Sequence, residues 1–345
     1  MNLSDFDYAL PDELIAQEPV TPRDASRLLV LPAAGGTAHR RFAELPALLR
    51  PGDLLVFNDT KVIPARLVGT KPSGGKVELL LCEPLEGGLG RRWRALGQAS
   101  KPIRAGAVLS FDGLSAEVEA AEGEGFYVVR LDREGEALEA ALARAGRVPL
   151  PPYIRRAASE EDRGRYQTVW ARAPGSAAAP TAGLHFTEGL LAALDARGVR
   201  RAAVTLHVGP GTFLPVRGDR VEGHTMHAER YEVTEAAAAE IAASRARGGR
   251  VVAVGTTTVR TLESAWDGTR VAAGSGRTAL FVRPGHVFGA VDALVTNFHL
   301  PRSTLLMLVC AFGGTPRVLG AYAAAVAARY RFFSYGDAML LERAG

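Results

Sequence analysis

The sequence predicts a mixed α/β main domain with a small antiparallel β-barrel inserted into it. Between about residues 60 and 135, short β-like runs are separated by glycine-rich turns, which is typical of an antiparallel sheet or a small barrel. After residue 153, helix-like and strand-like segments alternate, which indicates a largely parallel sheet. We therefore expect an α/β domain over 1–59 and 150–345 and an inserted barrel domain over 60–149.

The N-terminal half supplies strands to both parts. "RLLVL" (27–31) and "GDLLVFN" (52–58) are apolar strands like those after residue 150, so we assign them to the α/β domain. The predicted barrel strands include "KVELLL" (76–81), "AVLSF" (107–111) and "FYVVRL" (126–131). "SGGK" (73–76) is interpreted as a hairpin turn. "PLPPY" (149–153) is expected to be a stiff linker, because proline fixes φ and blocks a helix.

The C-terminal half shows helix starts followed by strands. Thr187 can cap a helix that ends at Gly198, before the strand "AAVTLHVG" (202–209). Thr234 can cap a second helix, before the strand "VVAVGTT" (251–257). A third strand, "AVDALVTNF" (290–298), precedes Ser303 and an apolar helix.

The composition is that of a globular protein with a large core. The chain has 345 residues, of which 47% are hydrophobic and 23% charged, so one large domain or two domains are expected. No apolar run reaches the roughly 20 residues of a membrane helix, and the acidic N-terminus does not resemble a signal peptide. The two cysteines are too few for a disulfide framework. We expect a cytoplasmic protein that does not bind a membrane.

Basic residues are concentrated in one stretch. The net charge is +4, but residues 61–104 alone hold nine basic and three acidic residues. All four lysines lie there, and the other 37 basic residues of the chain are arginines. A compact basic surface attracts polyanions such as RNA, although an ordinary solvated face would look the same in the sequence.

Three predicted strands end in polar, glycine-bearing segments: "LHVGPGTF" (206–213), "GTTTVR" (255–260) and "TNFHLP" (296–301). Ligands bind beyond the carboxyl ends of strands in open α/β sheets. "PTAGLHF" (180–186) would bring His185 nearby. We therefore expect a pocket of neutral hydrogen-bonding groups, although each residue alone could also be a satisfied core or turn position. The side chains expected along this edge are His207, Thr256, Thr257, Thr258, Asn297 and His299.

Three motifs of nucleotide-binding proteins and serine hydrolases are absent from the sequence, and one aspartate has two possible roles. The chain has no P-loop, no G-x-G-x-x-G turn after a strand and no G-x-S-x-G elbow. Asp337 in "SYGDAML" (334–340) is either a turn residue or a carboxylate that faces the pocket.

The segment "HTMHAE" (224–229) is rich in imidazole. A helix would place His224 and His227 on one face and Glu229 elsewhere, and a strand would place His227 with Glu229, so neither geometry gathers three ligands for a metal. An acid/base role for a His227 polarised by Glu229 and a structural turn both stay open. We expect no metal.

The chain resembles a known family along its whole length. "APTAGLHF", "TLHVGPGTFLPV", "HTMHAE", "GTTTVRTLESA", "VDALVTNFHLPRSTLLMLV" and "RFFSYGDAML" are similar to successive blocks of the S-adenosylmethionine:tRNA ribosyltransferase-isomerase family of queuosine biosynthesis. "FDYALPDELIAQEP", "RDASRLLVL", "GDLLVFNDTKVIPARLVG" and "GGKVELLL" fit in the same order. Departures are few: Pro210 replaces a common alanine, and His286 and Gly289 replace an aromatic residue and a lysine.

The resemblance implies a specific reaction. S-adenosylmethionine would be a cosubstrate that donates its ribosyl group, with no permanently bound cofactor. The acceptor would be 7-aminomethyl-7-deazaguanine at the wobble position of tRNA, and the products epoxyqueuosine, adenine and methionine. A base must remove the C5′ proton next to the sulfonium, and adenine must be protonated as it leaves. The candidates are His185, His207, His227 with Glu229, and His299.

The remaining expectations concern the oligomeric state, rival functions and the residues that contact tRNA and substrate. We expect the protein to act as a monomer. Rival hypotheses are a non-catalytic RNA-binding protein and a methyltransferase, although the chain lacks the glycine-rich first turn of the latter. The expected tRNA contacts are Lys61, Arg66, Lys76 and Arg92. The expected substrate contacts are Thr181, Gly183, Gly209, Gly211, Thr212, Thr256, Thr257, Arg260, Asn297 and Asp337.

Overall fold

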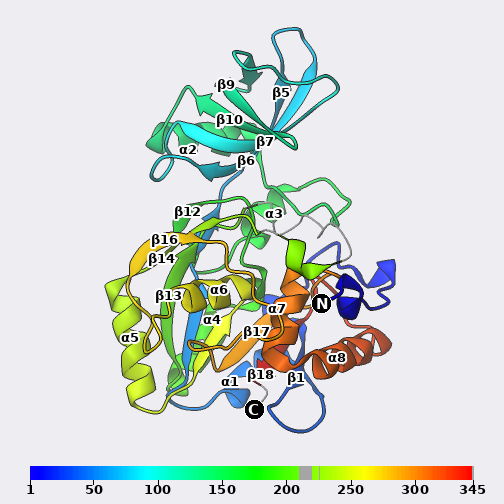
Figure 1. Ribbon diagram of the computed structural model, residues 1–345, viewed down its shortest axis with the longest axis vertical. Coiled ribbons are helices and arrows are strands. Elements are labelled where there is room, and N and C mark those ends of the chain that lie inside the picture. The colour runs from blue at the N-terminus through cyan, green and yellow to red at the C-terminus, as the bar shows by residue number, and fades with distance from the viewer. Residues whose placement is uncertain (210–219, 225, 344–345) are drawn as a thin grey trace.

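The described residues form two large β-sheets with separate apolar cores, as the computed structural model shows (Figure 1). The structure describes residues 1–209, 220–224 and 226–343. The larger sheet is mixed and carries helices, and the smaller is antiparallel and closes into a barrel. The predicted fold class is thereby confirmed.

The larger sheet has nine strands, and its centre is parallel. The strands β13, β3, β15 and β17 run in the same direction, so their carboxyl ends meet at one edge. The sheet is less parallel than predicted, because β18 is antiparallel to β17 and both margins contain antiparallel pairs. The order across the sheet is β16 (Gly274–Thr278), β14 (Glu229–Val233), β13 (Arg200–Leu206), β3 (Leu54–Asn58), β15 (Val251–Val254), β17 (Ala293–Asn297), β18 (Ala338–Glu342), β1 (Arg27–Leu31) and β2 (Ala38–Arg41).

Strand β3 shows why this sheet is buried on both faces. All five of its residues are buried, and side chains alternate between faces along a strand. Leu54 and Val56 belong to one apolar cluster, and Leu55 and Phe57 to the other. An N-terminal strand thus lies at the centre of the sheet formed mainly by the C-terminal half, as predicted.

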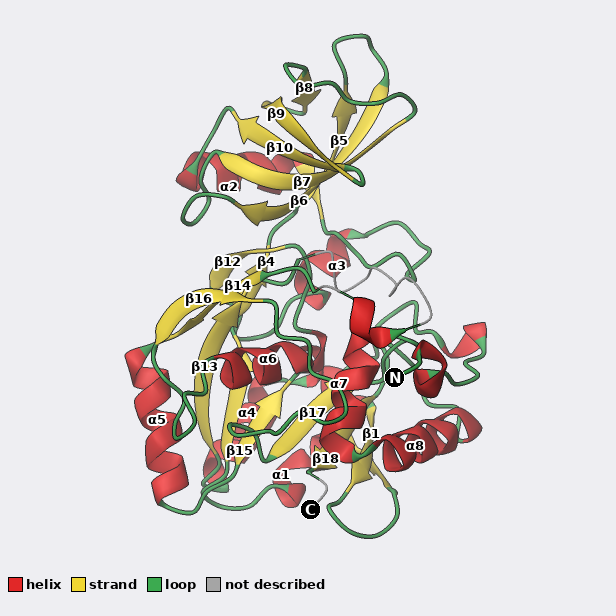
Figure 2. Cartoon of the chain, in the orientation of Figure 1, coloured by secondary structure: helices red, strands yellow, loops and turns green. Residues whose placement is uncertain are grey.

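Helices cover both faces of the larger sheet (Figure 2). On one face lie α1 (Leu45–Leu48) and α4 (Glu188–Ala196). On the other lie α5 (Glu235–Ala246), α6 (Thr256–Ser264), α7 (Thr304–Gly313) and α8 (Thr315–Ala327). Short 3₁₀ helices are Leu3–Phe6, Asp12–Leu14, Arg23–Ala25, Phe42–Glu44, Thr181–His185 and Val221–Gly223.

Side-chain caps begin three of these helices. The hydroxyl of Thr187 accepts a hydrogen bond from the Leu190 amide at 3.1 Å, and that of Thr234 from the Ala237 amide at 3.2 Å. Both caps were predicted, and Ser303 caps α7 in the same way. Each such cap stabilises a helix by about 1 kcal/mol.

The smaller sheet closes because its last strand pairs with its first. Strand β8 meets β5 at Ser110 and Thr70, and at Gly69 a Cβ would lie only 2.1 Å from the Ser110 carbonyl oxygen. Glycine is therefore required where these strands approach. Trp93 is fully buried inside the barrel, and α2 (Gly135–Ala145) packs Leu138 and Leu142 against the same core. The barrel order is β5 (Arg66–Thr70), β6 (Lys76–Pro84), β7 (Arg92–Ala99), β10 (Phe126–Leu131), β9 (Leu114–Gly123) and β8 (Val108–Phe111), and β11 (Gly146–Arg147) adds to β5.

Two connections join the barrel to the larger sheet. Strand β4 (Thr60–Val62) leads from β3 to the barrel and pairs in parallel with β12 (Ala173–Ser176) of the returning chain. The return also contains α3 (Glu160–Arg165). The boundaries at 59/60 and 149/150 stay a prediction.

In the described part of the chain, no single helix is long and apolar enough to cross a membrane, and α7 and α8 reach that length only as a pair bent by 114°.

Candidate functional site

A pocket lies at the carboxyl ends of β15 and β17, and we refer to it as the strand-end pocket. Helix α6 begins there with Thr256 and Thr257, after Gly255 at φ +91°. The structure brings together six of the predicted residues in its lining: Thr181, Thr256, Thr257, Arg260, Asn297 and His299. Thr258, in contrast, does not line the pocket, and its buried hydroxyl donates to the carbonyl of Val254 at the end of β15.

His299 is held as a neutral imidazole in this pocket. Its Nε2 is 2.9 Å from the Thr296 hydroxyl, and its backbone amide donates to the hydroxyl of Tyr322. Burial lowers the pKa of His299 to about 3. At neutral pH the ring therefore acts as a hydrogen-bonding group without charge.

His185 lies beneath the strand-end pocket and does not line it. Its Nδ1 contacts the Ser26 hydroxyl at 2.8 Å, its Nε2 contacts the Asn297 amide nitrogen at 3.1 Å, and its ring stacks on Phe42. Burial, with Arg331 as a smaller cause, lowers the pKa of His185 to about 3. The prediction of a catalytic role in the pocket is therefore not supported for His185, because both ring nitrogens are already used to support Asn297.

Two further predicted substrate contacts, Gly183 and Asp337, have contacts that stabilise the fold. A Cβ on Gly183 would lie 2.7 Å from a Thr168 methyl group, so this glycine permits close packing. The carboxylate of Asp337 accepts hydrogen bonds from the backbone amides of Arg27 and Arg331. Neither residue lines the strand-end pocket. Gly211 and Thr212 lie outside the described residues.

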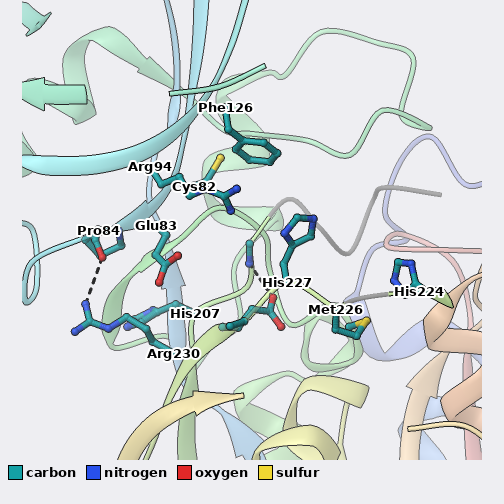
Figure 3. Close-up of a pocket in the computed structure, with 13 residues that line it drawn as sticks. Cys82, Glu83, Pro84, Arg94, Phe126, His207, His224, Met226, His227 and Arg230 are labelled. Carbon is teal, nitrogen blue, oxygen red and sulfur yellow. Dashed lines mark hydrogen bonds between the residues drawn. The ribbon is translucent and has the colours of Figure 1, made fainter. Parts of the chain in front are cut away.

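A second pocket lies between the barrel and the larger sheet, and we refer to it as the barrel-side pocket (Figure 3). In Figure 3, Phe126 and Arg94 of the barrel lie across from His227 and Met226 of the main domain. The Arg94 guanidinium stacks on the Phe126 ring at 4.0 Å. Sequence reasoning missed the barrel residues, since they meet the main domain only after folding. The lining consists of Cys82, Glu83, Pro84, Arg94, Phe126, His207, Gly209, His224, Met226, His227, Ala228, Glu229 and Arg230.

A buried ion pair separates the two pockets. Glu229 lines the barrel-side pocket and Arg260 the strand-end pocket, and Arg260 Nη1 donates to Glu229 Oε2. Glu229 Oε1 accepts the Gly209 amide at 3.0 Å, and Arg260 Nε donates to the Leu280 carbonyl at 3.1 Å. The pair and its hydrogen bonds form a common wall of the two pockets.

The histidines of "HTMHAE" do not converge. His227 is exposed with its ring 6.0 Å from that of Phe126, whereas the His224 ring lies 5.5 Å from that of Phe281. Of the two alternatives left open for His227, polarisation by Glu229 has no support, because the Glu229 carboxylate is engaged by Arg260 and Gly209. The alternation of a strand does not apply to His227, since β14 begins only at Glu229. Among the described residues, no group of three or more His, Cys, Asp or Glu side chains could hold a metal ion.

His207 lies where the barrel-side pocket meets an open groove beside Gly87, Gly88 and Arg277. Its Nδ1 is 2.9 Å from the Thr60 hydroxyl. Burial, followed by the nearby Arg230 guanidinium, lowers the pKa of His207 below its usual value. The ring is therefore neutral near pH 7 and has one nitrogen engaged.

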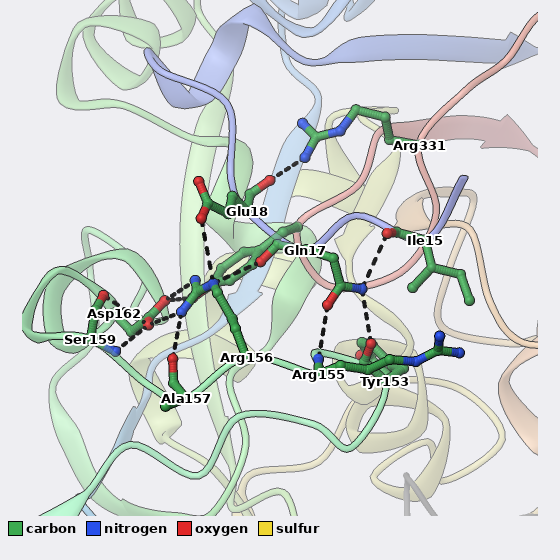
Figure 4. Close-up of polar contacts among 11 residues, drawn as sticks. Ile15, Gln17, Glu18, Tyr153, Arg155, Arg156, Ala157, Ser159, Asp162 and Arg331 are labelled. Carbon is green, nitrogen blue, oxygen red and sulfur yellow. Dashed lines mark hydrogen bonds and ion pairs between the residues drawn. The ribbon is translucent and has the colours of Figure 1, made fainter. Parts of the chain in front are cut away.

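The chain that returns from the barrel supplies Tyr153 to the strand-end pocket. Gln17 Nε2 donates to the Tyr153 carbonyl at 3.0 Å, and Arg156 forms two hydrogen bonds with Asp162, at 2.6 and 2.8 Å (Figure 4). Burial alone would raise the pKa of Asp162, but hydrogen bonds from Arg156, the Ser159 amide and a tyrosine hydroxyl hold it well below its usual range. This network anchors the return segment to the N-terminal segment.

The basic stretch of the barrel is mostly neutralised. Residues 105–149 carry nine acidic and four basic residues, so the expected basic surface does not extend over the whole barrel. Three of the four predicted RNA contacts have carboxylate partners: Lys61 with Glu139 at 3.3 Å, Arg66 with Glu78 at 2.8 Å and Arg92 with Glu119 at 2.9 Å. Lys76 is exposed and has no ion-pair partner among the described residues.

Comparisons with known proteins agree along the whole chain. Residues 3–341 match the family described as "Queuosine biosynthesis protein". The S-adenosylmethionine:tRNA ribosyltransferase-isomerase of Anaeromyxobacter sp. (strain Fw109-5) is 82% identical over 344 residues, which cover 100% of both chains. The enzyme of the same name from Xanthomonas euvesicatoria pv. vesicatoria (strain 85-10) is 56% identical and covers 99% of this chain and 97% of its own. The crystal structure of S-adenosylmethionine tRNA ribosyltransferase from Thermotoga maritima is 42% identical, with a TM-score of 0.57, and covers 98% of this chain and 100% of that one.

Proposed function

The chain belongs to the queuosine biosynthesis protein family, and on that premise we propose that it is a tRNA ribosyltransferase-isomerase that uses S-adenosylmethionine as ribosyl donor. The acceptor is the aminomethyl group of 7-aminomethyl-7-deazaguanine at the wobble position of tRNA. The ribosyl group is rearranged during transfer to give epoxyqueuosine, and adenine and methionine are released. Relatives that match over their full lengths are named for S-adenosylmethionine and tRNA.

The observation that carries the proposal is the pair of pockets that share one wall. A reaction between a small donor and a base of a large RNA needs two adjacent sites. The strand-end pocket is lined by neutral hydrogen-bonding groups, and we assign it to S-adenosylmethionine. The barrel-side pocket has an aromatic wall at Phe126, and we assign it to the wobble base. The ion pair of Glu229 and Arg260 then lies beside the boundary at which donor and acceptor must meet.

The surroundings of the four candidate histidines support different roles. His207 is neutral, and the segment 207–209 lines both pockets, so we assign His207 as the base for a C5′ proton held at their boundary. His185 and His299 do not serve as proton donors, because a pKa of about 3 leaves them without a proton to give near pH 7. His227 lines the barrel-side pocket and not the strand-end pocket, so we place it beside the wobble base and assign none of the four histidines to the protonation of adenine.

Lysines at one end of the barrel support contact with the tRNA backbone. Lys71 and Lys76 flank the β5–β6 turn, and Lys71 Nζ donates to the Lys101 carbonyl at 3.1 Å. None of these three lysines has an ion-pair partner among the described residues. Unpaired cations attract phosphates more effectively than cations already bound to carboxylates, so we expect the tRNA to contact this end of the barrel.

The test is release of adenine from S-adenosylmethionine, followed by chromatography with and without tRNA. Release should require tRNA that carries the aminomethyl-deazaguanine, and His207→Gln should slow it by at least about 100-fold, the usual loss of a general base. The matched control is His39→Gln, which changes an exposed histidine on β2 and should leave the rate unchanged. Formation of S-adenosylhomocysteine would instead indicate a methyltransferase. Tight tRNA binding with the donor left intact would indicate an RNA-binding protein.

A further inference from the structure

We propose that Thr60 is a positioning residue whose hydroxyl holds the His207 imidazole in the tautomer protonated on Nδ1, with the Nε2 lone pair directed toward the barrel-side pocket. Its catalytic consequence rests on the proposed function, whereas the contact itself can be tested without the reaction. Neither the strand-end pattern nor the histidine spacing indicated Thr60, because it lies about 150 residues before His207 in the sequence.

The position of the His207 ring is fixed by a backbone hydrogen bond and by packing against Gly175. The His207 backbone amide donates to the Arg230 carbonyl at 3.0 Å, which ties the residue to β14. On one side the ring packs against Gly175, where a Cβ would lie 3.2 Å from both Cε1 and Nδ1 of the imidazole. Gly175 also has φ +140°, which disfavours other residues. Room for the ring therefore depends on glycine at this position.

One buried amide aligns the segments that carry Thr60 and His207. Asn58 Oδ1 accepts hydrogen bonds from the backbone amides of Thr60 at 3.1 Å and Leu206 at 3.0 Å. Asn58 Nδ2 donates to the Leu206 carbonyl at 2.9 Å. Because Leu206 directly precedes His207, these bonds fix the distance between the Thr60 hydroxyl and the imidazole.

The contacts of the Thr60 hydroxyl favour one tautomer, although the contact with Ala173 is long for a hydroxyl hydrogen bond. The oxygen lies 2.9 Å from His207 Nδ1 and 3.5 Å from the Ala173 carbonyl oxygen. A hydroxyl has a single proton, and a carbonyl can only accept. Both contacts form together only if Thr60 donates to Ala173 and accepts from Nδ1–H of His207. A neutral imidazole protonated on Nδ1 carries its lone pair on Nε2.

The free nitrogen lies on the side of the ring away from Thr60. Within the described residues, His207 Nε2 has no hydrogen-bond partner, and the ring borders the barrel-side pocket. In the proposed reaction the C5′–H bond breaks, its electron pair stays on carbon, and the proton passes to Nε2. With the opposite tautomer Nε2 would carry a proton and could not accept one.

Nitrogen NMR tests the contact directly in the wild-type protein labelled with ¹⁵N-histidine. The two ring nitrogens of each tautomer have different shifts, and the His207 signals are identified as those lost in His207→Gln. The expected result near pH 7.5 is a protonated Nδ1 and an unprotonated Nε2. A protonated Nε2 would overturn the inference, whatever the protein does with tRNA. Failure of the proposed function alone would appear as the expected tautomer without adenine release.

Two substitutions of Thr60 test the consequence. Thr60→Val keeps the branched shape but removes the hydroxyl, and Thr60→Ser keeps the hydroxyl. We expect Thr60→Val to lose the single tautomer and to lower kcat/KM by about five- to tenfold, the size of one net hydrogen bond, and Thr60→Ser to retain both. The control is Thr261→Val, which removes a fully buried hydroxyl that, among the described residues, bonds to the Thr257 carbonyl alone and should change neither quantity. Equal losses in both Thr60 variants, or no change of tautomer in Thr60→Val, would refute the positioning role.

Discussion

Acidification from about pH 7.5 to about pH 5 is expected to lower the free energy of unfolding because of His185 and His299. Burial lowers the pKa of each imidazole to about 3 in the folded protein, whereas an unfolded chain has a histidine pKa of about 6.5. The unfolded state therefore binds protons first as the pH falls. The stabilisation is fully present above about pH 6.5 and is lost progressively between pH 6.5 and pH 3.

The size of the loss follows from the width of that window. Each proton that binds only to the unfolded state lowers the free energy of unfolding by about 1.4 kcal/mol per pH unit of acidification. At pH 5, which is about 1.5 units below the unfolded pKa, each histidine contributes a loss of about 2 kcal/mol. The two together lower the free energy of unfolding by about 4 kcal/mol, a large part of the stability of an ordinary domain.

Urea unfolding followed by circular dichroism at several pH values measures this loss. His185→Gln and His299→Gln should each reduce the pH dependence by about one proton, and the exposed His39→Gln should leave it unchanged. A loss below about 1 kcal/mol at pH 5 would refute the burial of two neutral imidazoles. The same conclusion would follow if either buried variant kept the full pH dependence of the wild type.

Further predictions concern charges and metal. Glu229→Gln leaves the Arg260 guanidinium without its buried carboxylate and should cost about 3 kcal/mol in urea unfolding; a cost below about 1 kcal/mol would mean that the pair behaves like one on the surface. Asp162→Asn should destabilise the protein at pH 7 but less and less below about pH 4, since a carboxyl with a depressed pKa stabilises only while ionised; a difference independent of pH would contradict this. Lys76→Ala should reduce the slope of tRNA affinity against salt by slightly less than one, whereas Arg92→Ala, whose charge is already paired, should reduce it less; equal slopes would mean that pairing does not matter. Adenine release should survive exhaustive chelation, and activity that is lost and then restored by zinc would refute the prediction of no metal.

The elements that could be predicted from the sequence are those with local causes. Thr187 and Thr234 cap their helices through amides three residues ahead, so residue type and spacing suffice. The central strand β3 is recognisable because its first four residues are apolar. The lining of the strand-end pocket by Thr256 and Asn297 follows from a general property of parallel sheets.

Other features depend on contacts between distant segments, which no local pattern encodes. His185 and Asp337 have residue types that suit a pocket, but Ser26 and Arg27 from the N-terminal segment engage them. The buried partner of Glu229 is Arg260, which lies 31 residues further along the chain. The sequence alone suggested the nearby His227 as its partner. The neutralisation of the basic stretch likewise requires the closed barrel, which brings acidic residues of β9 next to Arg92.

The most direct test of the account follows the ribose carbons of S-adenosylmethionine. The protein is mixed with tRNA that carries the aminomethyl-deazaguanine and with donor labelled by ¹³C throughout the ribose, and the digested tRNA is analysed by mass spectrometry. We predict a modified nucleoside that has gained all the labelled ribose carbons, together with unlabelled adenine and methionine in equal amounts. A tRNA without label, or label found in S-adenosylhomocysteine, would contradict the account.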